Sequence, residues 1–162
     1  MTRQSLAALA AALLLPLGVG ALGALATSSS VRTWYPTLVR PSFAPPSWVF
    51  GPAWTALYVM MGVASWLVWR EGLARPDVRS ALALYGVQLA FNLAWSWLFF
   101  GLRQPLLALV DIVVLLALVA LTIGRFAPVS RTAAGLLLPY LAWVAFATAL
   151  NGAFWWLNRN SA

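Results

Sequence analysis

The segment WYPTLVRPSFAPPSWVFGPAWTALY, from Trp34 to Tyr58, contains three of the ten tryptophans and five of the ten prolines of this 162-residue chain. Proline lacks a backbone N–H and its ring clashes with the preceding helical turn, so prolines at this density do not fit one regular helix. We therefore predict an ordered loop that leads into a helix beginning between Pro46 and Trp48. The aromatic rings of such a loop must be buried against lipid, protein or a ligand.

The chain on both sides of this segment is strongly apolar. Hydrophobic residues make up 63% of the sequence and charged residues only 8%, whereas a soluble domain is about half apolar and about a quarter charged. This excess of apolar surface predicts a membrane protein. Every basic residue is Arg, and the arginines flank the apolar runs, as is typical of membrane proteins. The net charge of +7 therefore does not indicate nucleic-acid binding, which needs a basic cluster interleaved with polar residues.

Cysteine and histidine are both missing from the sequence. Without cysteine, no disulfide, thiolate metal site or thiol nucleophile can form. Without histidine, the chain lacks the commonest general base and the commonest ligand of metals and haem iron. We therefore predict no metal site and no resident cofactor.

Five apolar segments each approach the roughly 20 residues that an α-helix needs to cross the hydrocarbon core of a membrane. Short linkers between the last four force neighbouring helices to run antiparallel. We therefore predict an all-α fold over residues 1–162, a single domain built as an integral membrane bundle of five transmembrane helices. The predicted spans are residues 6–26, 47–69, 80–100, 105–123 and 133–157, with an aromatic and proline-rich loop over residues 28–46.

The first span has a second interpretation. Arg3, the apolar run and the Ala-Leu-Ala at residues 24–26 also resemble a signal peptide with its cleavage site. However, the run is longer than in most signal peptides, and its three glycines suit close helix packing. We expect a retained helix, and an intact mass that lacked residues 1–26 would contradict this expectation.

Five spans place the two termini on opposite sides of the membrane. By alternation, six arginines then lie on the side of the N-terminus and four on the other side. Because arginine is enriched in cytoplasmic loops, this distribution favours a cytoplasmic N-terminus. The aromatic loop would then face away from the cytoplasm.

Polar side chains inside a span are costly in hydrocarbon, so each is a candidate for function. In the third span, Gln88, Asn92 and Ser96 recur every four residues and share one helix face, beside Trp95 and Phe99. Such a face suits a ligand with a flat apolar body and polar edges. The same amides would equally serve as hydrogen-bonding glue between helices.

Two other spans carry a comparable stripe of aromatic and polar residues. Pro139 precedes the stripe of the fifth span and is expected to kink that helix. Together with the third span, these faces could line one apolar pocket with a few placed polar groups, although packing is the alternative for any single tryptophan. The stripes comprise Trp54, Tyr58, Met61 and Ser65 in the second span, and Tyr140, Trp143, Ala147 and Asn151 in the fifth.

Asp111 is the only acidic residue well inside a span. A proton relay would need partners, and the chain contains no His or Lys to provide them. We therefore expect a structural carboxylate that accepts hydrogen bonds or pairs with an arginine at the membrane edge.

Three groups of residues together resemble a known family. They are Trp34-Tyr35, Arg40-Pro41, Pro45-Pro46, Trp48, Phe50, Trp54 and Leu57-Tyr58 near the loop; Gln88 to Asn92, Trp95 and Phe99 to Gly101 in the third span; and Pro139 to Trp143, Ala145 to Ala147 and Leu150-Asn151 in the fifth. In order and spacing, they resemble the translocator protein family, whose bacterial members are called tryptophan-rich sensory proteins. The likeness covers nearly the whole chain.

The resemblance implies a five-helix bundle in a bacterial cell membrane, commonly a homodimer, with a ligand cavity under the first loop. Family ligands include porphyrins such as protoporphyrin IX, haem and, in animals, cholesterol. The loop, with Trp34, would be the lid of the cavity. With Arg40 and Tyr140 added from their chemistry, the predicted ligand-binding residues are Trp34, Arg40, Trp54, Tyr58, Asn92, Trp95, Tyr140, Trp143, Phe146, Ala147 and Leu150.

Physical chemistry agrees with a porphyrin ligand in several respects. A flat aromatic molecule is expected to stack on Trp and Phe, and its two propionates would pair with Arg32 and Arg40. Strong axial ligation of haem iron is not expected without His or Cys, so metal-free porphyrin should bind about as well as haem. In the fifth span, Gly152 and Trp156 stand where the sterol pattern of animal members has a tyrosine and a basic residue. Sterol binding there is therefore in doubt.

Three functions follow from this resemblance. The first is porphyrin binding in the sensing or control of tetrapyrrole levels, and the second is transport of porphyrin or other hydrophobic ligands. The third is a light- and oxygen-dependent porphyrin-degrading enzyme, in which family likeness makes Trp54 and Trp143 the redox residues. The chain has no ordinary acid–base or nucleophile set and no clear internal repeat, so binding ranks first and an enzymatic role is not expected.

Overall fold

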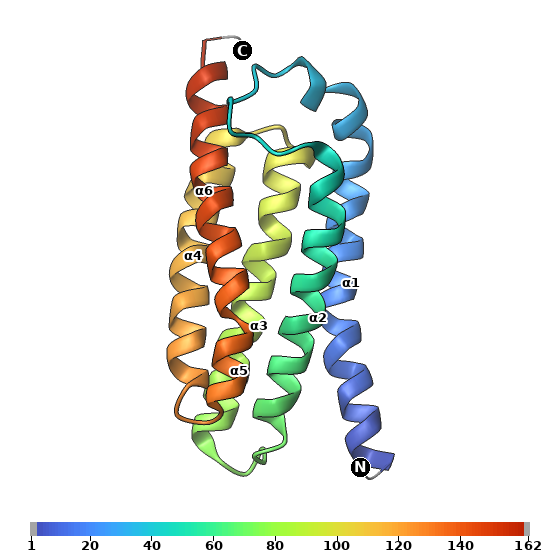
Figure 1. The fold of residues 1–162 in the computed structure, drawn as a ribbon, viewed down its shortest axis with the longest axis vertical. Helices are drawn as coiled ribbons and strands as arrows, with labels where there is room; N and C mark the ends of the chain where they lie inside the picture. Colours follow the sequence, from blue (N-terminus) through green and yellow to red (C-terminus); the bar gives the residue numbers. More distant parts are fainter. Residues whose placement is uncertain (1–2, 161–162) are drawn as a thin grey trace.

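The structure, a computed structural model, describes residues 3–160, and it contains five helical spans that are long and apolar enough to cross a membrane. Figure 1 shows these spans side by side in an elongated bundle with the two termini at opposite ends. The predicted all-α, five-span fold is confirmed. The helices are α1 (Arg3–Thr33), α2 (Phe50–Trp69), α3 (Pro76–Ser96), α4 (Pro105–Phe126), α5 (Arg131–Leu136) and α6 (Leu138–Asn158), with 3-10 turns at Tyr35–Thr37 and Ser47–Val49 and a π-helical turn at Trp97–Gly101.

Helix α1 is longer than the sequence predicted. The predicted loop at residues 28–46 is wrong at its start, because the helix continues to Thr33. The polar side chains in this part of the chain find hydrogen-bond acceptors within the helix. The hydroxyls of Thr27, Ser28 and Thr33 donate to backbone carbonyls three or four residues earlier, at 2.8, 3.1 and 2.9 Å.

The proline-rich connection therefore covers residues 34–46. It contains one 3-10 turn, Tyr35–Thr37, with Pro36 inside it. A second 3-10 turn, Ser47–Val49, leads directly into α2, so the predicted helix start between Pro46 and Trp48 is confirmed.

The fifth span is two helices rather than one. Helix α5 ends at Leu136 and α6 begins at Leu138, with Leu137 as the junction. Pro139 lies in the first turn of α6, where its missing N–H is tolerated but its ring prevents continuation of the preceding helix. The predicted disturbance at Pro139 is thus confirmed, and the fifth span, Arg131–Asn158, consists of these two helices.

Helix α1 lies at the edge of the bundle. Only 11% of its most apolar stretch is buried in the protein, against 39% for α2 and for the fifth span. It approaches α2 closely at Gly62, where a Cβ would lie only 2.8 Å from the carbonyl oxygen of Ala12. A larger residue at Gly62 would push the two helices apart. The bundle therefore holds α1 mainly through one face.

Asp111 departs from its expected role. Its side chain is 8% exposed, and one carboxylate oxygen is fully buried. Among residues 3–160, both ion pairs belong to Arg75, which contacts Glu71 at 3.8 Å and Asp77 at 2.7 Å, and no side chain donates a hydrogen bond to Asp111. The predicted pairing is wrong because Asp111 lies inside the bundle while the arginines lie at its two ends.

Candidate ligand-binding site

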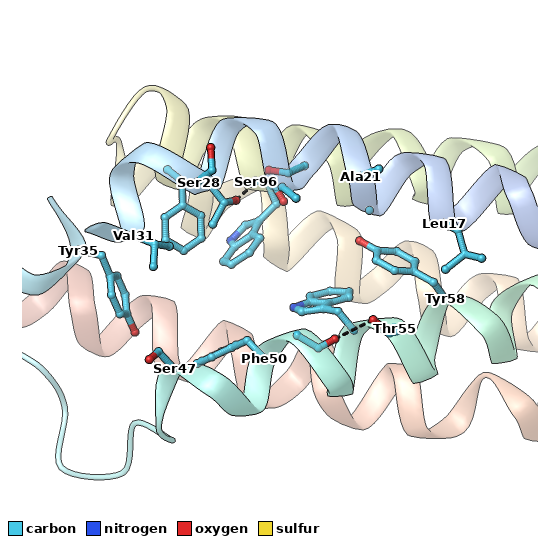
Figure 2. Close-up of a pocket in the computed structure, with 18 of the residues that line it drawn as sticks. Leu17, Ala21, Ser28, Val31, Tyr35, Ser47, Phe50, Thr55, Tyr58 and Ser96 are labelled. Carbon is cyan, nitrogen blue, oxygen red and sulfur yellow. Dashed lines mark hydrogen bonds between the residues drawn. The ribbon is translucent and has the colours of Figure 1, made fainter. Parts of the chain in front are cut away.

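A cavity of about 660 Å³, here called the outer cavity, lies between α1, α2 and the end of α3. Its volume is within the range of roughly 300–1,000 Å³ that small-molecule sites occupy. Figure 2 shows α1 on one side and α2 on the other, with Tyr58 at one end and Tyr35 at the end nearest the loop. Its lining is mainly apolar and aromatic, with hydroxyls from Thr27, Ser28, Ser47, Thr55 and Ser96.

Small residues of α1 make up one wall of the outer cavity. Gly20, Ala21, Gly23 and Ala24 all line it. A Cβ at Gly20 would clash with the ring of Tyr58, so this glycine allows α1 to approach the tyrosine. These four residues project little from the helix, so this part of the wall leaves space in the cavity for a ligand.

Aromatic rings make up the facing wall. The ring of Trp54 stacks on that of Tyr58 with centroids 5.4 Å apart and an interplanar angle of 27°. Trp95 lines the same cavity from α3. Three predicted ligand-binding residues, Trp54, Tyr58 and Trp95, are thus brought together around the outer cavity.

A second, much smaller cavity of about 30 Å³, here called the inner cavity, lies on the side of α6. Trp143, Ala147 and Leu150 line it, whereas none of them lines the outer cavity. The three predicted stripes meet at this small cavity, which is lined by Trp54 from the second span, Trp95 from the third, and Trp143, Ala147 and Asn151 from the fifth. Five aromatic residues that line both cavities separate them: Tyr35, Phe50, Trp54, Trp95 and Phe100.

Asn92 and Tyr140 lie in a buried hydrogen-bond network instead of a cavity wall. The hydroxyl of Tyr58 donates to the side-chain oxygen of Asn92 at 2.8 Å, and the amide nitrogen of Asn92 donates to the hydroxyl of Tyr140 at 3.0 Å. The Tyr140 hydroxyl in turn donates to Gln88 at 2.9 Å. This chain of side chains connects α2, α3 and α6. Of the two roles that the sequence allowed for these amides, the geometry matches glue between helices.

The loop covers the end of the bundle and is held at several points. Its backbone at Val39 is paired with Asn158 of α6, which accepts from the Val39 N–H at 2.8 Å and donates to the Val39 carbonyl at 3.1 Å. Just before the loop, in the last turns of α1, Ser30 donates to the carbonyl of Phe100 at 2.6 Å. Trp34 packs edge-on against Phe99 with ring centroids 5.7 Å apart. The loop thus closes the bundle over the aromatic residues.

The two loop arginines occupy different positions. Arg32 lines the outer cavity, and it alone is charged among the described residues that do so. Arg40 instead donates to the carbonyl of Pro45 at 3.0 Å and lies over the ring of Tyr35 at 5.9 Å. Burial raises the pKa of Tyr35, and the nearby charge of Arg40 opposes that shift. Arg40 therefore stabilises the loop, while Arg32 faces the cavity.

Phe146, the last of the predicted residues, contacts rings on both sides. Its centroid lies 5.7 Å from that of Trp143 and 6.3 Å from that of Phe43 in the loop. It lies beneath the loop and lines neither cavity.

Several lining residues were not among the predicted ligand-binding positions. Four of them in α1, Gly20, Ala21, Gly23 and Ala24, carry small side chains without a chemical signature, and the glycines of the first span suggested close packing only. Phe50 and Phe100 belong to the matched motifs, which could have identified them.

Comparison with known proteins agrees with this architecture. Residues 12–157 match the model of the TspO/MBR family. The chain is 46% identical over 150 residues to the tryptophan-rich protein TspO of Archaeoglobus fulgidus, covering 93% of this chain and 96% of that protein. It is 48% identical over 124 residues to the human translocator protein, covering 75% and 73% of the two chains.

A third relative is bacterial. The tryptophan-rich sensory protein of Cereibacter sphaeroides is 39% identical over 146 residues, which cover 88% of this chain and 89% of that protein. Together with the five apolar spans, these matches support a multi-pass integral membrane protein, and the bacterial relatives support the predicted bacterial setting. The chain belongs to the TspO/MBR family.

Proposed function

We propose that this membrane protein binds a flat, carboxylate-bearing tetrapyrrole such as protoporphyrin IX in the outer cavity. The observation that carries the proposal is the lining of this cavity, which combines small residues of α1 with the rings of Trp54 and Trp95. A planar aromatic ligand would contact both walls at once. Stacking on the indole rings and burial of the macrocycle would supply most of the affinity.

Arg32 provides the charge that such a ligand needs. It lines the end of the outer cavity near the loop, whereas the guanidinium of Arg40 already donates to Pro45. A propionate would therefore pair with Arg32 in a charge-assisted hydrogen bond. The second propionate would use the nearby hydroxyls of Ser28 or Ser47, which also line this cavity.

The iron of haem would gain little from this site. The sequence has no His or Cys, and the hydroxyl of Tyr58 is engaged with Asn92. We expect metal-free and iron protoporphyrin to bind with similar affinity, because stacking and charge pairing do not depend on the metal.

Binding of this kind serves the sensing or control of tetrapyrrole levels, and the names of two relatives, a sensory protein and a translocator protein, agree with sensing and with transport respectively. We further propose that the protein acts as a homodimer, which cross-linking in the native membrane would test.

Light-dependent degradation of the ligand is the second candidate function. It is favoured by one observation: Trp54 lines the outer cavity, and Trp143 lies directly behind it with ring centroids 6.4 Å apart.

Titration of the purified protein with protoporphyrin IX, followed by tryptophan fluorescence in the dark, tests binding. We expect saturable quenching in the wild type. Ala24→Phe places a large side chain in the outer cavity and should lower the affinity for protoporphyrin IX at least tenfold. Leu14→Phe is the matched control, because Leu14 lies on α1 with 67% of its side chain exposed outside that cavity. Absence of saturable quenching in the wild type would refute the proposal.

Illumination of the saturated complex then separates binding from degradation. Loss of the porphyrin absorption bands in the wild type but not in Trp54→Phe or Trp143→Phe would favour the enzyme. Stable bands in all three proteins would favour sensing or transport. Uptake of porphyrin into proteoliposomes would then distinguish those two functions.

A further inference from the structure

We propose that Asn151 determines which ligands fit the outer cavity, because it fixes Trp95 as part of the wall between the two cavities. This inference rests on the proposed binding function. The five rings that line both cavities, called the aromatic partition below, are Tyr35, Phe50, Trp54, Trp95 and Phe100.

Within the described chain, Trp95 alone among the five rings has a side-chain hydrogen bond. Its indole N–H donates to the side-chain oxygen of Asn151 at 2.9 Å. Its ring also stacks on Phe99 with centroids 5.5 Å apart. Stacking tolerates a change of ring orientation, whereas a hydrogen bond weakens steeply when its angle changes. The bond to Asn151 therefore sets the orientation of the indole.

Asn151 is itself held firmly. Its side chain is 2% exposed, and its amide nitrogen donates to the carbonyl of Pro105 at the start of α4 at 2.8 Å. The amide group thus joins α3, α4 and α6 through its two ends. Rotation of this amide would break both hydrogen bonds, so Trp95 is bonded to a rigid acceptor.

The orientation of Trp95 decides the depth of the binding site. The inner cavity, at about 30 Å³, has room for a single water molecule, so it admits no part of a ligand while the partition is closed. With Trp95 in place, a ligand finds a flat wall and must itself be flat. If the indole turned, the two cavities would join and would accept substituents that stand out of the ligand plane.

A selectivity measurement tests this proposal. The two probes are protoporphyrin IX, which is flat, and tetrakis(4-carboxyphenyl)porphyrin, whose phenyl rings stand out of the plane of the macrocycle. We expect the wild type to prefer the flat probe and Asn151→Leu to reduce the ratio of the two affinities at least fivefold. Leu has the branched shape of Asn but a larger volume, so the substitution removes the hydrogen bonds without enlarging the inner cavity.

A purely structural role would weaken both probes equally and leave the ratio unchanged, and that result would overturn the proposal. Thr148→Ala is the matched control, because Thr148 lies on the same helix and donates only to the carbonyl of Val144 in its own helix. If Asn151→Leu does not fold, Asn151→Ser replaces it, since a serine can bond to the carbonyl four residues earlier.

The double variant Asn151→Leu/Trp95→Phe tests the route of the effect. If Asn151 acts through Trp95, the substitution at residue 151 changes the ratio no further once the indole is gone. An additional change in the Trp95→Phe background would overturn the proposal.

A readout without any ligand separates this inference from the proposed function. In protein labelled with 5-fluorotryptophan, the ¹⁹F resonance that disappears in Trp95→Phe belongs to Trp95. We expect it to be single and narrow in the wild type and broadened, doubled or shifted in Asn151→Leu, with no such change in Thr148→Ala. An unchanged Trp95 resonance would refute the positioning role even if porphyrin binds. Failure of the wild type to bind either porphyrin, with the resonance altered as expected, would refute only the proposed function.

Discussion

The two sides of this bundle use polar side chains in opposite ways. Between α2, α3 and α6, the side chains of Tyr58, Asn92, Tyr140 and Gln88 bond to one another in the protein interior. Beside α1, the hydroxyls of residues such as Thr55 bond only to their own helix, and the space between the helices stays open. The difference shows that the tightly bonded side keeps the shape of the protein, which allows the α1 side to remain available for a ligand.

The largest expected effect is on the bonded side. Asn92→Leu leaves the hydroxyl of Tyr58 without an acceptor and removes the donor to Tyr140, which keeps only its bond to Gln88. We expect a loss of about 2–4 kcal/mol in the free energy of unfolding. Thr55→Val, a change of similar chemistry beside α1, should cost less than about 0.5 kcal/mol, because its hydroxyl bonds only within its own helix. Unfolding in mixed detergent micelles measures both. Equal losses would contradict the contrast between the two sides.

The second-largest effect is expected at a contact between the two sides of the bundle. Gly20→Ala should destabilise the protein by about 1–3 kcal/mol, since the new Cβ clashes with Tyr58 and displaces it from Asn92. Gly18→Ala is the matched control, because nothing lies within 4 Å of a Cβ at that position. The control should stabilise α1 by up to about 1 kcal/mol, as alanine is the better helix former. A neutral Gly20→Ala would show that α1 and Tyr58 can separate freely.

The third effect concerns the charge at the open side. Arg32→Gln should weaken binding of protoporphyrin IX about tenfold, or about 1.4 kcal/mol, with little change in stability. Arg40→Gln should change the affinity less than about twofold, because Arg40 is engaged with the loop backbone. For the dimethyl ester of the porphyrin, titrated in the same way, the affinity of Arg32→Gln should equal that of the wild type. A larger loss for Arg40→Gln than for Arg32→Gln would reverse the assignment.

The smallest effect is expected at the loop. Asn158→Ala removes both hydrogen bonds to Val39, which lie at an exposed site and are each worth about 0.5–1.5 kcal/mol or less. We expect the rate of ligand dissociation to rise a few-fold while the stability of the bundle hardly changes. Stopped-flow fluorescence measures the rate, and Asn160→Ala, two residues further along and exposed, is the control. An unchanged rate would show that the loop does not limit ligand release.

The sequence predicted correctly those features that depend on a single helix. The apolar runs predicted the five spans, and Pro139 predicted the interruption of the last one. The stripe of Gln88 and Asn92 is buried as its spacing indicated. Each of these features depends on the period of a helix or on the chemistry of one residue.

Predictions failed where the outcome depended on a neighbour. The loop was predicted to begin at residue 28, but α1 continues to Thr33, and its Ser30 bonds to the carbonyl of Phe100 in the neighbouring π-helical turn. Asp111 was expected to meet an arginine or a hydrogen-bond donor, yet it is buried among the helices and both ion pairs of the described residues belong to Arg75. The sequence cannot show such distances, because they are set by how the helices are arranged.

The sequence by itself determined the number of spans, the buried faces and the family. A helix that crosses hydrocarbon satisfies its backbone hydrogen bonds within itself, so its apolar length and polar spacing are visible in one segment of the chain. Tertiary structure alone decided where the ligand space lies. The approach of α1 to Tyr58 depends on Gly20, and the closure of the partition depends on Asn151 meeting Trp95 from another helix. The physical reason is that a cavity is defined by the distance between helices, which small side chains permit and interhelical hydrogen bonds fix.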